Sequence, residues 1–348
     1  MKRFFCTYFD SNYMIYGLTL FRSLEETVPD FHLYVLCLDE TCYQTLKSLD
    51  KRIQAIRLSE LEAFDPVLAE CRNNRSLVEY YFTLTPSLPL YLFHLDPTLT
   101  LLAYLDSDLL FYSSPECAFE ELSSHSFFIV PHNYSSYAKE SEQLFGKYNV
   151  AFQIYRNNDV GKAALHWWRE RCIEWCRDYS ENGRFADQKY LDHLPHIFGG
   201  EIVISQNKGL NLAPWNINKF TLYCSPGEEK VDGEPLVFFH YQAYKFILNY
   251  FFVAWPFWHG IPVDYSIWNY FSMHYYQALL KTRKKFRKQI SWKSPAELRN
   301  SLTPYLGRVE WMTQLIPGTY LRQLFRLITL TIFFPHRDFH GFGFRGRF

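Results

Sequence analysis

The sequence is organised around residues 101–112, which read Leu-Leu-Ala-Tyr-Leu-Asp-Ser-Asp-Leu-Leu-Phe-Tyr. A short, continuous apolar run is typical of a strand that is buried on both faces. Because a charge inside such a strand would be costly, we expect Asp106 and Asp108 just past its carboxyl end. In an open parallel sheet, that edge is where ligands bind.

Asp106 and Asp108 are separated by one residue, so in an extended segment their side chains point the same way. Two such carboxylates suit a hard divalent cation that also takes diphosphate oxygens, which indicates Mn²⁺ or Mg²⁺. The alternative is a solvated turn with two ordinary aspartates. The buried strand before the pair favours the metal site.

The first third of the chain alternates predicted strands and helices, which is typical of an α/β fold with a doubly wound, mostly parallel sheet. No Gly-x-Gly-x-x-Gly and no Walker loop occurs, which counts against a dinucleotide-binding or P-loop fold. The eight cysteines form no Cys-x-x-Cys pair, which favours reduced thiols in a cytosolic protein. The predicted strands are 3–9, 32–38, 53–58, 101–105, 126–131, 147–155 and 235–240. The predicted helices are 14–24, 40–49, 75–93 with a break near its prolines, 115–122 and 159–175.

Residues 104–111, Tyr-Leu-Asp-Ser-Asp-Leu-Leu-Phe, resemble the Asp-x-Asp motif of nucleotide-sugar glycosyltransferases with the GT-A fold. The similarity is to the retaining glycogenin and bacterial galactosyltransferase type, family eight, and covers roughly residues 1–245. It implies a GT-A-like catalytic domain over 1–245 that binds a nucleotide-diphosphate sugar, a UDP-sugar in the first instance. Residues 246–348 would form a helical, aromatic and basic extension.

The turn after the first strand contains four candidate donor-binding residues: Thr7, Tyr8, Asp10 and Asn12. Asp10 and Asn12 are also good helix-capping residues, so a plain helix start is the alternative. The resemblance implies that the donor's base and ribose lie here. Tyr8 would stack on the base, Asp10 or Asn12 would hydrogen-bond it, and the helix N-terminus would add N–H donors.

Three further donor-binding candidates follow from the resemblance: Arg75, Ser107 and Asn149. Relatives carry a basic residue on the helix that contains Arg75, and a guanidinium suits phosphate or sugar oxygens; a solvated Arg is the alternative. In the family, the strand that begins near Asn149 opens with an Asn that faces the donor sugar. A turn residue is the alternative there.

The pair Asp187 and Gln188 resembles the Asp-Gln pair that lies beneath the donor sugar in retaining transferases. Such a pair stabilises an oxocarbenium-like centre or contacts acceptor hydroxyls. Asp187 could also cap the helix that follows it.

His240 and Lys245 resemble the family's closing motif, in which a His completes the metal site and a Lys contacts the diphosphate. The glycines that the family has between them are missing here.

The loop 209–216 contains Trp215, which we expect to be exposed; a packed Trp is the alternative. The loop resembles one in related bacterial transferases, which implies that it lines the acceptor side. The chain is neutral overall, but residues 281–348 hold 14 Lys and Arg against 3 Asp and Glu. Helices are predicted over 264–288 and 320–334. The basic stretch 281–334 suits an anionic membrane surface, with a solvated helix or a dimer contact as alternatives.

No apolar run is long enough to span a bilayer, and the first residues lack a signal-peptide core. We therefore expect a cytoplasmic protein, peripheral at the inner face of the cell membrane. The predicted function is metal-dependent glycosyl transfer to a hydroxyl of a glycan, glycolipid or protein, with retention, in cell-envelope glycan or glycolipid synthesis.

Three alternatives to this function stay open. A sugar-phosphate nucleotidyltransferase would need a Gly-rich loop after the first strand, where this chain has no Gly. A non-catalytic nucleotide-sugar or glycan-binding protein would keep the same ligands. A nucleic-acid binder would use the basic tail, although no recognised module is present.

Overall fold

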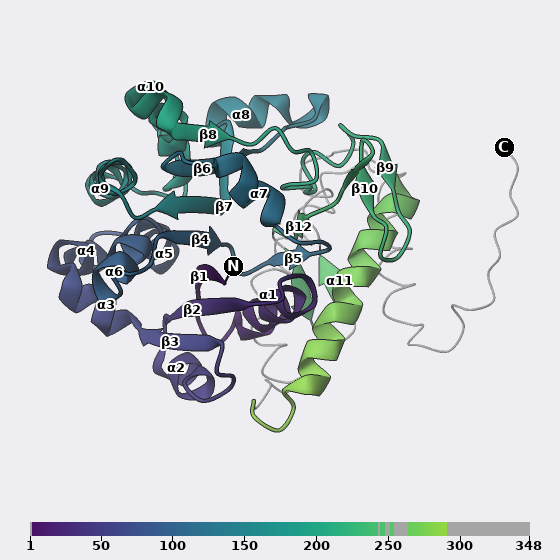
Figure 1. Ribbon diagram of the computed structural model, residues 1–348, viewed down its shortest axis with the longest axis horizontal. Coiled ribbons are helices and arrows are strands. Elements are labelled where there is room, and N and C mark those ends of the chain that lie inside the picture. Colours follow the sequence, from purple (N-terminus) through teal and green to yellow (C-terminus); the bar gives the residue numbers. More distant parts are fainter. Residues whose placement is uncertain (1, 243, 248–250, 254–263, 291–348) are drawn as a thin grey trace, which may run out of the picture. The chain divides into compact units, whose positions relative to one another are not determined.

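The computed structural model describes residues 2–242, 244–247, 251–253 and 264–290 (Figure 1). The chain divides into two compact units. The first comprises Met1–Gln242 and Trp255–Gln289, and the second Ala243–Ala254 and Ile290–Phe348. In the second unit, β13 (Lys245–Ile247) and β14 (Phe251–Val253) form an antiparallel hairpin.

The first unit is built on a seven-stranded sheet with the order β3-β2-β1-β4-β7-β6-β8 (Figure 1). Four of its six strand pairs are parallel, and β7 runs antiparallel to both β4 and β6. The α/β fold with a mostly parallel sheet is therefore confirmed. The strands are β1 (Arg3–Phe9), β2 (Phe31–Cys37), β3 (Ile53–Arg57), β4 (Leu101–Leu105), β6 (Phe127–Pro131), β7 (Tyr148–Arg156) and β8 (Ile202–Ile204).

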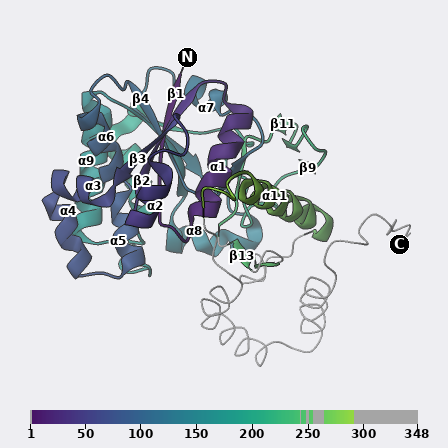
Figure 2. The same cartoon turned by 90° about the horizontal axis from the view of Figure 1, so that it is seen from below.

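Helices cover both faces of this sheet, which is why its central strands are apolar on both sides. Figures 1 and 2 show α3 to α6 and α9 on one side, with α1 on the other. The helices are α1 (Met14–Thr27), α2 (Glu40–Leu46), α3 (Leu58–Phe64), α4 (Pro66–Glu70), α5 (Leu77–Leu84), α6 (Ser87–Leu95), α7 (Glu116–Leu122), α8 (Lys139–Phe145), α9 (Asp159–Glu174), α10 (Leu194–Phe198) and α11 (Tyr265–Lys285). Short 3₁₀ turns are η1 (Cys71–Asn73), η2 (Ser136–Ala138), η3 (Gln188–His193) and η4 (Gly199–Glu201).

The helix predicted over 75–93 is two helices, α5 and α6, with the break at Thr85 and Pro86. Proline lacks the N–H that a continuous helix would use, so the ladder stops there. Ser76 caps α5 and forms a capping box with Glu79, which fixes the start of that helix.

The strand predicted over 235–240 does not join the main sheet. Its last part, β12 (Phe238–His240), pairs antiparallel with β5 (Leu109–Phe111) in a separate two-stranded sheet. The reason is that β1 and β7 already occupy both sides of β4, so the chain that leaves β4 turns away and forms its own pair. The remaining small strands, β9 (Leu222–Tyr223), β10 (Lys230–Val231) and β11 (Glu234–Pro235), form a three-stranded sheet.

Helix α11 belongs to the first unit, so the predicted boundary between residues 245 and 246 differs from the division in the structure. The helix packs beside α1, where Thr19 Oγ1 donates to Thr282 Oγ1 at 2.9 Å. Lys285, within the basic stretch proposed to meet a membrane, lies 2.5 Å from a carboxylate oxygen of Glu25. The predicted helix 320–334, the tail after it and most of the run 246–258 lie outside the described residues.

Within the part of the chain that the structure describes, no helix combines the length and the apolar character that crossing a membrane requires.

Candidate active site

Asp106, Asp108 and His240 form a compact group beyond the carboxyl end of β4. The backbone N–H of Asp106 donates to the carbonyl of Ala151, and the carbonyl of Asp108 accepts from the backbone N–H of Tyr241. The pairing of β12 with β5 places His240 opposite Leu109. Two backbone ladders therefore bring the imidazole to carboxylates that are more than a hundred residues away in sequence.

The side chains of this group have the spacing of a metal site. His240 Nε2 lies 3.2 Å from Asp108 Oδ1 and 3.8 Å from Asp106 Oδ2, and one ligand atom from each residue lies within 4.8 Å of the others. Among the described residues, no other group of three His, Cys, Asp or Glu side chains has such a spacing. Two carboxylates with one imidazole suit Mn²⁺, and Mg²⁺ with less preference for the nitrogen.

The electrostatics of the group favour a cation. Burial raises the pKa of Asp106 to about 6; the nearby His240 lowers it and Asp108 raises it further. Burial alone would lower the pKa of His240, but the two carboxylates outweigh it and hold that pKa above its ordinary value. Two carboxylates this close favour a positive partner, and a divalent cation at the same place would supply one.

Tyr8 belongs to the same network, through Tyr104. The Tyr104 hydroxyl donates to Asp106 Oδ1 at 2.9 Å, and its ring lies 5.8 Å from the ring of Tyr8. The Tyr8 hydroxyl meets Thr85 Oγ1 at 3.1 Å. Thr7 is fully buried and, as the neighbour of Tyr8 in a strand, points to the opposite face of the sheet. Of the two donor candidates Thr7 and Tyr8, Tyr8 is therefore the one that lies near Asp106, with Tyr104 between them.

Asp10 and Asn12 are engaged in the turn that starts α1. Asp10 Oδ1 accepts from the backbone N–H groups of Asn12 and Tyr13 at 3.0 and 2.9 Å, and Asn12 Nδ2 donates to Asp10 Oδ2 at 3.0 Å. These bonds form a turn ahead of α1, whose N-cap residue is Tyr13, so neither Asp10 nor Asn12 caps the helix. A role of either residue with the donor's base stays a prediction.

Asn149 and Gln188 meet beside the metal group. Because β7 runs antiparallel to β4, its first residues lie at the edge where β4 ends, and Asn149 is its second residue. Asn149 Nδ2 donates to Gln188 Oε1 at 3.3 Å, and Gln188 Nε2 donates to the carbonyl of Phe145 at 2.9 Å. The structure thus joins two residues that the sequence suggested separately.

Asp187 is a buried carboxyl with an unusual environment. It is 4% exposed, and its Oδ2 has no hydrogen-bond partner among the described residues. Burial raises its pKa to about 7; the Thr85 hydroxyl lowers it and the charge of Asp106 raises it. Asp187 stands just before η3 but its side chain makes no capping hydrogen bond, so the capping alternative is wrong. A buried carboxyl with a strongly raised pKa is typical of a functional site.

Arg75 and Trp215 make contacts that the sequence did not predict. The guanidinium of Arg75 donates to the carbonyls of Cys172 and Ile173 at 2.9 and 2.8 Å, and to Thr83 Oγ1 at 2.7 Å, which ties α5 to the end of α9. Trp215 is 2% exposed, so the expectation of an exposed Trp was wrong. Its ring instead meets the ring of His240 edge-on, with centroids 5.3 Å apart.

Lys245 and Ser107 complete the predicted set. Ser107 lies in the turn between the two aspartates of the metal group. Lys245 begins β13 in the second unit, so its contact with a diphosphate stays a prediction.

Comparison with known proteins places the chain among bacterial relatives. It is 30% identical over 259 residues to the uncharacterized protein YfnF of Bacillus subtilis (strain 168), across 71% of this chain and 83% of that protein. It is 31% identical over 236 residues to the uncharacterized protein YfnD of the same organism, across 66% and 74%. The chain belongs to the YfnF and YfnD family. No protein-family model matches it.

A solved structure shows the fold of this family member. The galactosyltransferase LgtC, crystallised with donor and acceptor sugar analogs, superposes with a TM-score of 0.50 at 16% identity, across 82% of this chain and all of that one. The predicted GT-A fold of nucleotide-sugar glycosyltransferases is therefore confirmed.

Two residues of this YfnF-family site were missed by the sequence analysis, Tyr104 and His132. Tyr104 was interpreted only as part of a buried strand, yet it is the strand residue that holds Asp106. β6 is parallel to β4, so His132, which follows β6, lies at the same edge of the sheet as Asp106. His132 contacts Asn149 there. The signal was available, because a polar residue just after a buried strand was the reason for choosing Asp106.

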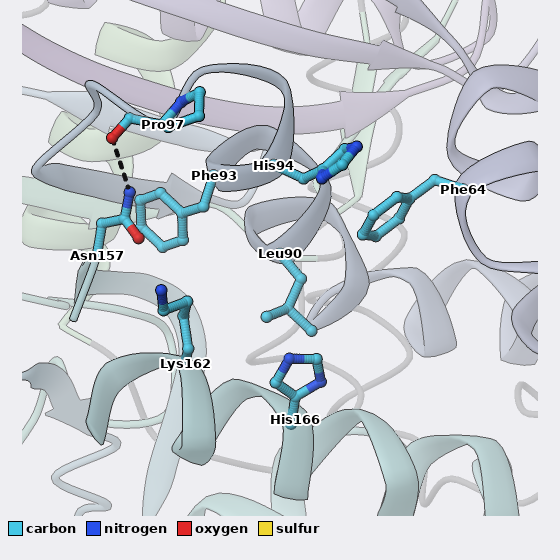
Figure 3. Close-up of a pocket in the computed structure, with 8 residues that line it drawn as sticks. All are labelled: Phe64, Leu90, Phe93, His94, Pro97, Asn157, Lys162 and His166. Carbon is cyan, nitrogen blue, oxygen red and sulfur yellow. Dashed lines mark hydrogen bonds between the residues drawn. The ribbon is translucent and has the colours of Figure 1, made fainter. Parts of the chain in front are cut away.

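A separate pocket of about 530 Å³ lies at the other edge of the sheet (Figure 3). Pro97, which precedes β4, and Asn157, which follows β7, line it, and Asn157 Nδ2 donates to the Pro97 carbonyl at 3.4 Å. Asp106 and Asn149 lie at one end of strands β4 and β7, and Pro97 and Asn157 lie at the other end of the same strands. The pocket is therefore not part of the candidate active site. Its other lining residues are Phe64, Leu90, Phe93, His94, Lys162 and His166.

Proposed function

We propose that this protein is a metal-dependent glycosyltransferase that moves a sugar from a nucleotide-diphosphate donor, a UDP-sugar, to an acceptor hydroxyl. The observation that carries the proposal is the group of Asp106, Asp108 and His240 at the carboxyl edge of β4, with the buried carboxyl of Asp187 in the same electrostatic environment. This combination supports an anionic leaving group on the metal side and a developing positive charge at the sugar.

Asp106, Asp108 and His240 would hold Mn²⁺ or Mg²⁺, which as a Lewis acid would neutralise the diphosphate as it leaves. Tyr104 keeps Asp106 oriented through the hydrogen bond from its hydroxyl. Tyr8 offers an aromatic face next to Tyr104 for the donor's base. Lys245 is proposed to add positive charge at the diphosphate, while Arg75 is left out because backbone carbonyls engage its guanidinium.

Asp187 and Gln188 are proposed to act on the sugar. In its ionised form, Asp187 would stabilise positive charge that develops at the anomeric carbon, and its Oδ2, which no described residue engages, is available for that role. Gln188 would orient a sugar or acceptor hydroxyl. We propose retention of configuration, as the family-eight resemblance implies, with a glycan, glycolipid or protein of the cell envelope as acceptor.

We also propose that the basic stretch 281–334 holds the enzyme at an anionic membrane surface on the cytoplasmic side. The support is the charge of residues 281–348, which hold 14 basic and 3 acidic residues.

The decisive experiment measures release of nucleoside diphosphate from UDP-, GDP- and ADP-sugars, with and without Mn²⁺. Because Asp108→Asn removes one anionic ligand, we expect it to weaken Mn²⁺ binding by about tenfold or more and to abolish release. Asp159→Asn, an exposed aspartate at the start of α9, is the matched control and should behave as wild type.

The outcomes separate the alternatives. Metal-dependent release from one donor, lost in Asp108→Asn and kept in Asp159→Asn, supports the transferase. If donors raise the melting temperature with metal but candidate acceptors never elicit release, the non-catalytic binding protein is correct. If no donor shifts the melting temperature, the proposed function fails.

A further inference from the structure

His132 is held rigidly at the edge of the sheet that carries the metal group. Its ring stacks on Tyr134, with centroids 4.6 Å apart and planes at 11°, and meets the edge of Trp215 at 5.4 Å. Its backbone carbonyl accepts from Trp215 Nε1 at 2.9 Å and from Asn216 Nδ2 at 2.8 Å, while its N–H donates to the carbonyl of Lys147. The ring is therefore fixed before any ligand binds.

The contact between His132 and Asn149 has a defined direction. Asn149 Oδ1 accepts from the backbone N–H of Ala151 at 2.8 Å, and a backbone N–H can only donate. The amide nitrogen must then face His132, and Nδ2 lies 2.9 Å from Nε2. Since an amide nitrogen also only donates, Nε2 must be the acceptor. His132 is thus neutral, with its proton on Nδ1.

The electrostatic surroundings agree with a neutral ring. Burial lowers the pKa of His132 to about 3, and the nearby His240 lowers it further. His132 is 3% exposed.

Gln188 has an equally defined orientation. Its Nε2 donates to the Phe145 carbonyl, which can only accept, so Oε1 is left to face Asn149. Both N–H groups of Asn149 are then in use, one toward His132 and one toward Gln188. Within the described residues, the groups left over are one N–H and one lone pair of Gln188, one lone pair of Asn149 Oδ1, and the Nδ1–H of His132.

We propose that His132 is a positioning residue: by accepting one N–H of Asn149, it directs the other to Gln188 Oε1 and so presents the remaining N–H of Gln188 to the substrate. The catalytic part of this inference rests on the proposed function. It also predicts how Asn149 meets a sugar, because that residue has only an acceptor left and would take a hydrogen bond from a sugar hydroxyl.

The first test observes the proton on His132 and needs no turnover. In full-length protein with ¹⁵N-labelled histidine, the His132 signals, assigned by their loss in His132→Phe, should show the neutral ring with Nδ1–H from about pH 5 to about pH 8. Asn149→Asp is the positive control, because a carboxylate oxygen facing Nε2 should draw the proton to that nitrogen. A wild-type ring that titrates in this range, or carries its proton on Nε2, overturns the proposal.

The second test measures donor turnover. His132→Phe keeps a ring in the stack but removes the acceptor, and we expect kcat to fall by about tenfold or more with donor KM within about twofold. His132→Gln, whose amide oxygen can accept the same hydrogen bond, should restore part of kcat. His125→Phe is the matched control at the opposite end of β6, where ring atom Nδ1 lies 3.1 Å from the Leu122 carbonyl, and its kcat should not change.

Three results would count against the proposal. Wild-type kcat in His132→Phe overturns it, and so does a loss of kcat that a fall in the folded fraction explains fully. If wild type turns over no donor, the proposed function fails, and the catalytic role of His132 fails with it. A proton on His132 Nδ1 in the same protein would still show that the hydrogen bonds from His132 through Asn149 to Gln188 are oriented as inferred.

Discussion

Replacing Asp187 by Asn should make the protein more stable while it removes the proposed activity. The carboxyl is 4% exposed, its Oδ2 is without a partner among the described residues, and burial raises its pKa from 3.8 to about 7. Ionising this group in the folded protein is therefore unfavourable. The isosteric amide removes that penalty because it carries no charge.

The sign and size of the effect follow from the raised pKa. In the unfolded chain the group ionises near 3.8, so between pH 3.8 and about 7 the folded state binds more protons and stability falls as pH rises. Below pH 3.8 the penalty vanishes, and above about pH 7 it is complete. A shift of about three pH units corresponds to roughly 4 kcal/mol, which is the largest gain that Asp187→Asn can bring.

The assay is urea unfolding of wild type and Asp187→Asn without metal at about pH 5, 6.5 and 8. We expect the difference in the free energy of unfolding to grow with pH and to reach about 2–4 kcal/mol at the highest pH. Asp192→Asn is the control, because that carboxylate accepts from the backbone N–H of Lys147 and pairs with Lys189, so its loss should destabilise. If Asp187→Asn is equally stable or less stable than wild type at about pH 8, the assignment of Asp187 as a strained functional carboxyl is refuted.

Two further substitutions test structural roles. Arg75→Lys should lower the free energy of unfolding by about 2 kcal/mol, since Lys cannot donate to two carbonyls at once, and should leave donor KM unchanged; a raised KM at wild-type stability would instead support a donor contact. Phe271→Ala on α11 should cost about 3–5 kcal/mol in unfolding experiments, because that ring is 1% exposed and stacks on Phe239. The control Met273→Ala, on the exposed face of the same helix, should change stability by less than about 0.5 kcal/mol, and equal losses in the two variants would show that α11 is not part of the core.

Much of the first unit could be predicted from local patterns. The bounds of β1 and β4 match the prediction residue for residue, and those of β2, β3, β6, β7, α1 and α9 differ by one to three residues. The positions of Asp106 and Asp108 followed from one rule, that a charge does not stay inside a buried strand. Asn149 and Gln188 were identified by resemblance, and the structure joins them by a hydrogen bond.

Errors occurred where the outcome depends on what packs nearby. Whether Trp215 is exposed is decided by the His132 carbonyl and the His240 ring, both remote in sequence. The contacts of Arg75 depend on where α9 ends. No periodicity within either segment contains that information.

The sequence by itself determined most strands of the main sheet and the longer helices beside it, where the sheet's ligand-binding edge lies, and which carboxylates stand there, because side-chain alternation and burial of charge act over a few residues. Only the tertiary structure decided that β12 pairs with β5, that His240 thereby reaches Asp108, and that His132 fixes the amide of Asn149. These contacts join segments between 17 and 132 residues apart. Their geometry follows from how the strands and loops close around one another, which is a property of the whole packed unit.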